Sequence, residues 1–154
     1  MRDMRRSDRK IDKKEALRIL SSGEYGVLST VSPDNQPYGF PVNFCVINEC
    51  IYFHCATEGH KIDNFSHNPK VSFCVVGKTI ILPEKFTTEY ESTIIFGLIS
   101  EAFDEEKQQA LEGLVYKYSQ DYYKEGLKYI VSLSEKTKVF KIVIKSITGK
   151  SRKK

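Results

Sequence analysis

The sequence predicts a mainly β protein, an antiparallel barrel of six strands with helices at its edge. Short apolar segments recur along the chain, and turn residues separate most of them. Few strand–helix–strand units are present, which disfavours a doubly wound parallel sheet. A dinucleotide-binding fold is also disfavoured, because no GxGxxG motif follows a predicted strand.

The N-terminal part of the chain is expected to form one helix and three strands. Asp12 and Glu15 have the spacing of a capping box, and Gly23 is placed to end the helix that they begin. The apolar face of this helix consists of Ala16, Leu17 and Leu20. Strands are expected at residues 25–31, 38–47 and 51–55, joined by the turns SPDNQ and INEC. Turns this short predict an antiparallel meander.

The remaining helices and strands are predicted in the same way, from the spacing of apolar residues and from the turn residues between them. A short helix is expected at 58–68, where Ile62 and Phe65 share a face toward the core. Further strands are expected at 71–82, 91–103 and 138–147. The first of these should bend or bulge at Gly77. Between the last two, helical spacing begins behind an expected Asp104 cap, and another helix is expected around 121–133.

The composition indicates one globular domain spanning residues 1–154. The chain has 154 residues, of which 40% are hydrophobic and 29% charged. No apolar run approaches the roughly 20 residues of a membrane-spanning helix. The basic N-terminus has no apolar stretch behind it, so neither membrane insertion nor a secretory signal is expected.

Positive charge is concentrated at the two ends of the chain. The net charge is +4, and Lys and Arg crowd the segments RRSDRK and GKSRKK. We expect residues 1–10 and 151–154 to be flexible, solvated tails. Nucleic-acid binding is disfavoured, because the interior shows no basic stripe interleaved with aromatic residues.

The cysteine spacing argues against a metal centre or a catalytic thiol. The cysteines lie at 45, 50, 55 and 74, and no two form a CxxC pair. His54, Cys55 and His60 are a candidate ligand set, but a strand-to-helix turn would separate their side chains. His54 and Cys55 also point to opposite faces of a strand, so they cannot easily share a proton. We therefore expect free thiols in a reducing cytoplasm and no metal.

The stretch HCATEGHK, residues 54–61, combines groups that suit a phosphate ester. The first amides of a helix lack intrahelical partners, and the helix dipole adds partial positive charge there. Gly59 permits close approach of a ligand, while Thr57, His60 and Lys61 supply donors. One interpretation is a phosphate site. The other is a capping or surface His60 beside a solvated Lys61.

His54 is the residue of this stretch that is hardest to explain as structural. In IYFHC, the pleat places Tyr52 and His54 on one face of the strand, opposite Ile51 and Phe53. If Ile51 and Phe53 face the core, His54 points toward a groove or a partner. A single histidine in a strand is otherwise most often a hydrogen-bonded structural residue.

Five segments carry a resemblance to a known family: GEYGVLSTV, QPYGFPVNF, IYFHCATEGHKIDNFSHNPKVSFCVV, YESTIIFG and ITGK. In this order they resemble the FMN-binding split-barrel proteins related to pyridoxamine 5′-phosphate oxidase. The nitroimidazole-resistance (Nim) branch is the most similar. The resemblance implies a six-stranded antiparallel split β-barrel that forms a homodimer, with flavins in clefts between the subunits.

The same resemblance implies a set of cofactor-binding residues. His60 and Lys61 would meet the flavin phosphate, and Thr57 would assist. The other implied contacts are Pro41, Val42, Asn43, His54, Cys55 and Ala56 beside the ring, Glu91 and Ser92 from the cleft edge or the partner, and Lys150 from the C-terminus. His54 is also the implied catalytic histidine.

These features predict an FMN-dependent oxidoreductase that reduces small electron-poor aromatics such as nitroimidazoles, with FAD as an alternative cofactor. Reduced flavin can pass a hydride to an acceptor stacked on it, and His54 could donate a proton or orient that acceptor. Oxidation of pyridoxamine phosphate is not expected, because no second set of basic residues is available for its phosphate. Two alternatives stay open: a flavin- or haem-binding module without turnover, and an interaction protein with an empty cleft.

Overall fold

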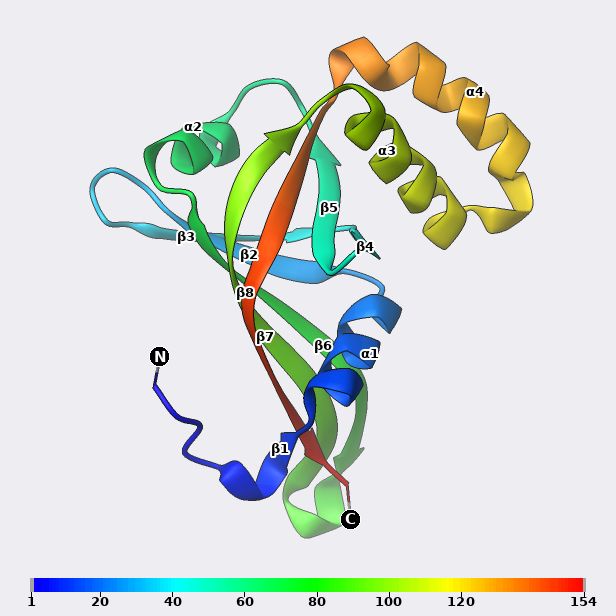
Figure 1. Ribbon diagram of the computed structural model, residues 1–154. Coiled ribbons are helices and arrows are strands. Elements are labelled where there is room, and N and C mark those ends of the chain that lie inside the picture. The colour runs from blue at the N-terminus through cyan, green and yellow to red at the C-terminus, as the bar shows by residue number, and fades with distance from the viewer. Residues whose placement is uncertain (1, 154) are drawn as a thin grey trace.

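The computed structural model describes residues 2–153, which form one antiparallel sheet flanked by four helices (Figure 1). The strands are β1 (Lys10–Ile11), β2 (Gly26–Val31), β3 (Pro37–Val42), β4 (Cys45–Ile47), β5 (Cys50–Cys55), β6 (Lys70–Leu82), β7 (Thr87–Ala102) and β8 (Lys138–Arg152). The helices are α1 (Lys13–Ser22), α2 (His60–His67), α3 (Asp104–Tyr118) and α4 (Tyr123–Leu133). The mainly β, antiparallel prediction is therefore confirmed.

The sheet differs from the predicted six-stranded barrel, in which the first three strands form a meander. The sheet has 8 strands in the order β3-β2-β6-β7-β8-β5-β4, and β1 pairs with β8. The predicted strand at 38–47 forms two strands, because the strand conformation is interrupted between them, at Asn43 and Phe44. The Phe44 side chain is fully buried, and its backbone N–H donates to the Tyr118 hydroxyl (3.0 Å) instead of to a strand. As a result β2 pairs with β3 and β6, whereas β4 pairs with β5.

Two register shifts interrupt the pairing of the long central strands, one between β6 and β7 and the other between β7 and β8. The pairing register shifts between Val76 and Thr79, which confirms the bulge expected at Gly77. A Cβ at Gly77 would lie 2.7 Å from the Glu91 Cγ, so a side chain there would displace Glu91. A second shift at Gly97 was not predicted. There a Cβ would come within 2.6 Å of the Val143 carbonyl oxygen.

The helix predictions agree with the structure apart from one cap. Asp12 caps α1 by accepting from the Glu15 backbone N–H (2.8 Å), as the sequence predicts. At the start of α3 the predicted aspartate cap is wrong. Phe103 occupies the cap position, and Asp104 is the first helical residue, with φ of 53°. In residues 2–153 no helix is both long enough and apolar enough to span a membrane.

Two apolar clusters lie on opposite sides of β5. The first fills the inside of the curved sheet and includes Ile51, Phe53 and Phe65. The second lies between β5 and the α3–α4 pair and includes Tyr52 and Ile130. Figure 1 shows α3 and α4 packed together beyond β5, at the end of the molecule opposite the β6–β7 hairpin tip. β5 thus separates the two clusters, with alternate side chains entering each one.

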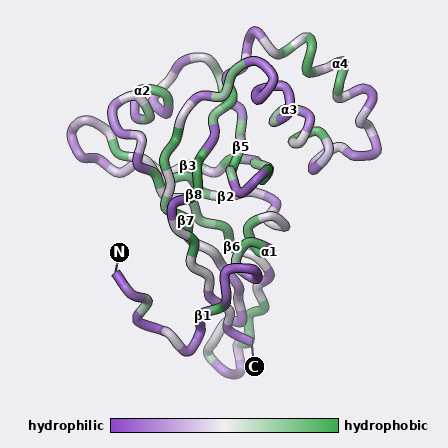
Figure 2. Tube along the Cα trace, viewed as in Figure 1, coloured by the Kyte–Doolittle hydropathy of each residue, from purple (hydrophilic) through white to green (hydrophobic). Residues whose placement is uncertain are grey.

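Parts of both predicted tails form secondary structure. Residues Ser7–Arg9 form a 3₁₀ turn, Lys10 and Ile11 pair with β8, and β8 itself continues to Arg152. Figure 2 shows a mostly hydrophilic N-terminal segment beside strands that carry more hydrophobic residues. The outermost residues of both predicted tails, 1 and 154, lie outside the described residues. The flexibility of the tails stays a prediction.

Candidate cofactor-binding site

The start of α2 presents unpaired backbone donors toward a small cavity. Gly59 is the residue before the helix, with φ of 138°. A Cβ there would meet no atom within 4 Å, so the glycine is needed for its backbone conformation and not for space. The first intrahelical bond runs from the Asp63 N–H to the Gly59 carbonyl, and no side chain caps the helix. The preceding amides therefore face outward at the positive end of the helix dipole.

A buried hydrogen-bond chain fixes the first side chain of this helix. The Asn64 amide donates to the Thr30 hydroxyl (3.0 Å), and Thr30 donates to the Tyr38 carbonyl (3.0 Å). The Ser32 hydroxyl donates to the Asn64 side-chain oxygen (3.1 Å) and lies 3.1 Å from the His60 Nε2. Because Ser32 has only one hydrogen, this network assigns the donor proton to the His60 Nε2. The His60 Nδ1 is then left for a ligand.

Aromatic rings contact the side chains of His60 and Lys61. The Tyr38 and His60 rings lie 4.2 Å apart between centroids, with 30° between their planes. The Lys61 Nζ lies 4.4 Å from the centroid of the Phe40 ring. The cavity beside them has a volume of about 140 Å³ and is lined by Tyr38, Cys55, Ala56, Glu58, Gly59, His60, Lys61 and Ile62. The structure therefore brings His60, Lys61, Cys55 and Ala56 together, and Thr57 lies exposed in the adjoining loop.

Two strands beside this cavity each leave one backbone edge unpaired. β3 pairs only with β2, and the end of β5 at His54 and Cys55 pairs only with β8. Tyr38 and Cys55 line the small cavity together, whereas Asn43 and His54 line a second cavity together. Residues at or next to the two free edges, and so beside the gap between them, therefore line both cavities. Of the other predicted contacts on β3, Pro41 is exposed and Val42 packs partly on the core.

His54 lies on the opposite side of β5 from the small cavity. It lines the cavity of about 200 Å³ between β5 and the α3–α4 pair, together with Asn43. The ring is accessible from this cavity, yet the surrounding atoms partly desolvate it, which lowers the pKa of His54. The pleat argument is thereby confirmed: Ile51 and Phe53 face the inner core and His54 faces away from it.

Three predicted residues lie far from this site within one chain. Glu91 is buried, forms an ion pair with Arg18 (3.0 Å), and lines a separate cavity of about 410 Å³ beside Gly77. Ser92 lies opposite Lys150 in the β7–β8 pairing. One chain therefore does not bring Glu91, Ser92 or Lys150 together with His60 and Lys61.

Sequence reasoning missed the residues that position His60. Thr30, Ser32 and Asn64 are all buried polar side chains, at 2%, 7% and 1% exposure, and they hydrogen-bond one another. One signal was available, because Asn64 follows His60 by four residues and so lies on the same face of a helix. Ser32 carries no such signal, since only the fold brings it to α2.

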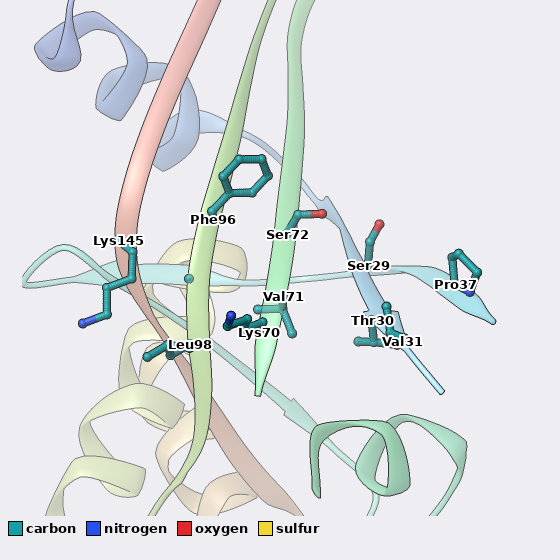
Figure 3. Close-up of a pocket in the computed structure, with 11 residues that line it drawn as sticks. Ser29, Thr30, Val31, Pro37, Lys70, Val71, Ser72, Phe96, Leu98 and Lys145 are labelled. Atoms are coloured by element: carbon teal, nitrogen blue, oxygen red, sulfur yellow. The ribbon is translucent and has the colours of Figure 1, made fainter. Parts of the chain in front are cut away.

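A cavity on the outer face of the sheet was not predicted from the sequence. It has a volume of about 640 Å³ and is lined by residues of β2, β3, β6, β7 and β8. Figure 3 shows Phe96 and Leu98 on β7 beside Ser72 on β6, with Lys145 on the flanking strand β8. In residues 2–153 no group of three or more His, Cys, Asp or Glu is arranged to hold a metal, and the four cysteines are free thiols.

Comparison with solved structures identifies the same fold in several bacterial proteins. A candidate 5-nitroimidazole antibiotic resistance protein from Bacteroides thetaiotaomicron is 24% identical, with a TM-score of 0.74 over 92% of this chain and 85% of that one. A conserved hypothetical protein from Mycobacterium tuberculosis is 19% identical, with a TM-score of 0.82 over 97% and 90%. An FAD and haem binding protein from Mycobacterium smegmatis is 16% identical, with a TM-score of 0.77 over 95% and 74%. At these identities the likeness concerns the fold alone.

The family assignment comes from the sequence itself. No curated protein matches the chain. The family described as pyridoxamine 5′-phosphate oxidase matches residues 12–151, which include every helix and nearly all of the sheet. The chain therefore belongs to the pyridoxamine 5′-phosphate oxidase family.

Proposed function

We propose that the protein binds FMN and uses it as an oxidoreductase to reduce small electron-poor aromatic molecules such as nitroimidazoles. The observation that carries this proposal is the start of α2. There, free amides, His60 and Lys61 surround a cavity next to two unpaired strand edges. A flavin nucleotide needs both parts, a cationic phosphate site and a slot with backbone donors and acceptors beside it.

The cavity at α2 has the chemistry of a phosphate site. Backbone amides at a helix start and an ammonium are donors to phosphate oxygens, and an imidazolium, which carries a proton on each ring nitrogen, would donate from the His60 Nδ1 as well. The buried chain through Ser32 and Asn64 holds His60 in place before any ligand arrives, which reduces the entropy lost on binding. FMN ends in a phosphate monoester and FAD in a diphosphate. The small volume of about 140 Å³ favours the single phosphate of FMN, with FAD as the alternative.

The two free strand edges suit the flavin ring. The backbone of Pro41, Val42 and Asn43 borders the gap on one side. The backbone of His54, Cys55 and Ala56 borders it on the other side. An unpaired edge offers alternating N–H and C=O groups, which can pair with the polar edge of a flavin as they would with another strand.

A homodimer would bring the remaining predicted contacts to the flavin. The outer face of β2, β6 and β7 exposes apolar side chains, at 39% for Val27, 58% for Val76, 45% for Ile94, 49% for Phe96 and 38% for Leu98. Such a continuous apolar face is typical of an interface between protein chains. Packing a second copy on this face would let Glu91, Ser92 and Lys150 of that copy approach the flavin. The dimer is part of the proposal.

When bound, the flavin supplies two-electron transfer to an acceptor placed beside it. In this chain His54 is positioned to orient that acceptor. The lowered pKa of His54 keeps its ring neutral near pH 7, so its N–H donates a hydrogen bond without adding charge to the cavity. The four free thiols are typical of a reducing compartment, which supports a cytoplasmic location.

A haem-binding module is the second candidate, because a protein of the same fold binds both FAD and haem. The absorbance spectrum of the purified protein, before and after addition of FMN, separates the two functions. We expect flavin bands that bleach with dithionite and recover when a nitroimidazole is added, and we expect FMN by mass spectrometry of the released ligand. A Soret band, or a colourless protein that does not bind added FMN, would contradict the proposal.

A further inference from the structure

A second cavity lies beside β5, between the sheet and the α3–α4 pair, and His54 forms part of its wall. Its volume is about 200 Å³, below the range of about 300–1,000 Å³ for sites that hold drug-sized ligands. The helices contribute its apolar wall, which consists of Leu111, Leu114, Val115, Tyr129, Ile130 and Leu133. The size and wall suit one aromatic ring or an apolar group of similar bulk.

The sheet side of this cavity contributes Asn43 and His54, and the helix side adds the hydroxyl groups of Tyr118, Ser119, Tyr129 and Thr137. Asn43 and His54 both line it, and neither side chain has a hydrogen-bond partner among residues 2–153. The Tyr118 hydroxyl, by contrast, already has hydrogen-bond partners. Its hydroxyl accepts from the Phe44 N–H (3.0 Å) and donates to the Glu24 carbonyl (2.6 Å), which ties the end of α3 to the sheet. On the sheet side of the cavity, beside the proposed flavin slot, Asn43 and His54 are therefore the groups with free hydrogen-bonding capacity.

No charged side chain lines this cavity. The nearby Lys117 ammonium is turned onto the Phe44 ring, with its Nζ 3.7 Å from the ring centroid. A carboxylate or phosphate entering the cavity would lose its hydration with no cation to replace it, and an ammonium would meet no anion. An uncharged ligand avoids both penalties. Its polar group can pair with Asn43 and His54 while its ring packs on the helices.

We infer that this cavity binds an uncharged molecule with a single aromatic ring, oriented by hydrogen bonds to the side chains of Asn43 and His54. The part of this inference that makes the cavity the acceptor pocket of a reductase rests on the proposed function. Asn43 follows the end of β3 and His54 lies near the end of β5, so a ring held by these two residues would lie beside the proposed flavin slot. The cavity also sets the charge and size limits of that acceptor.

Three near-isosteric probes test the inference: benzamide, benzoate and benzylammonium. Binding is measured by methyl NMR of the flavin-free protein with labelled Leu and Val. We expect benzamide to shift the methyl signals of Leu111, Leu114 and Leu133. We expect benzoate and benzylammonium to bind at least about tenfold more weakly, because each would bury an unpaired charge. Equal affinity for the three probes, or shifts confined to other methyl groups, would overturn the inference.

Two variants and one control sharpen this test. Leu133→Trp should fill the cavity and abolish benzamide binding. Asn43→Asp, at an exposed position that tolerates substitution, should reverse the preference so that benzylammonium binds best. Lys145→Ala alters the wall of the large outer cavity and should leave benzamide binding unchanged. An unreversed preference in a folded Asn43→Asp protein would contradict the inference.

A parallel FMN titration separates this inference from the proposed function. If benzamide binds in this cavity and FMN does not bind, the pocket is supported and the flavin function fails. If FMN binds and benzamide shifts none of the three leucine methyl signals, the pocket fails and the flavin function is unaffected.

Discussion

The buried Asn64 offers the sharpest single perturbation of the site, because it links stability to the position of His60. Its side chain is 1% exposed and forms two hydrogen bonds, at 3.0 Å to Thr30 and 3.1 Å to Ser32. Asn64→Leu conserves the approximate volume but leaves the Ser32 hydroxyl without its acceptor. A buried donor without a partner costs about 1–3 kcal/mol, and we expect the free energy of unfolding to fall by that amount.

The same substitution should weaken FMN binding. Once Ser32 loses its acceptor, its hydroxyl no longer has a fixed orientation, so the His60 ring loses the partner that holds it toward the phosphate. Loss of one oriented hydrogen bond is worth about 1.5 kcal/mol, or about tenfold in the dissociation constant.

Urea denaturation and a flavin fluorescence titration measure these two effects. Ser66→Ala, an exposed change on the same helix, is the control and should alter the unfolding free energy by less than about 0.5 kcal/mol. An Asn64→Leu protein that unfolds more easily but binds FMN with unchanged affinity would refute the link between this network and the site.

Three further predictions concern the backbone, the α3 contact and the pH response. Gly59→Ala should cost about 1–3 kcal/mol in unfolding free energy and weaken FMN binding, because its φ of 138° strains any residue with a Cβ. Tyr52→Phe removes the bond to the Glu106 carboxylate (2.8 Å) and should cost about 0.5–1.5 kcal/mol by urea denaturation, since Glu106 keeps its ion pair with Lys141. The lowered pKa of His54 means that the unfolded chain protonates this residue first as the pH falls. Stability should therefore decrease below about pH 6.5, and His54→Gln should reduce that decrease in denaturation curves measured between about pH 7.5 and 5.

The parts of the fold that depend on local chemistry were predictable from the sequence. The Asp12 cap, the bulge at Gly77 and the period of α2 all follow from residues close to one another in the chain. Strand order did not follow, because it depends on which distant edges meet. No residue near β3 in the sequence shows that this strand ends before Phe44. The end depends on the hydrogen bond between the Phe44 N–H and the distant Tyr118 hydroxyl.

The candidate site shows the same division between local and long-range information. The donors of the α2 start lie within a few residues, so one segment predicts them together. The network behind His60 joins α2 to the end of β2 through Ser32, 28 residues away in sequence. Likewise, the alternation of side chains along β5 predicts that His54 points away from the inner core. Only the packing of α3 and α4 shows that its side chain lines a second cavity.

The central claim, that the start of α2 holds a flavin phosphate, is tested most directly by comparing FMN with riboflavin, which lacks only that group. Calorimetric titration of the wild-type protein and of Lys61→Ala gives the contribution of the phosphate in each. We expect wild-type protein to prefer FMN strongly. Lys61→Ala should lower that preference by about 10- to 150-fold, equivalent to a charge-assisted bond of about 1.5–3 kcal/mol. Lys124→Ala, on the distant helix α4, should not change it. Equal affinity of the wild-type protein for FMN and riboflavin, or an unchanged preference in Lys61→Ala, would contradict the account.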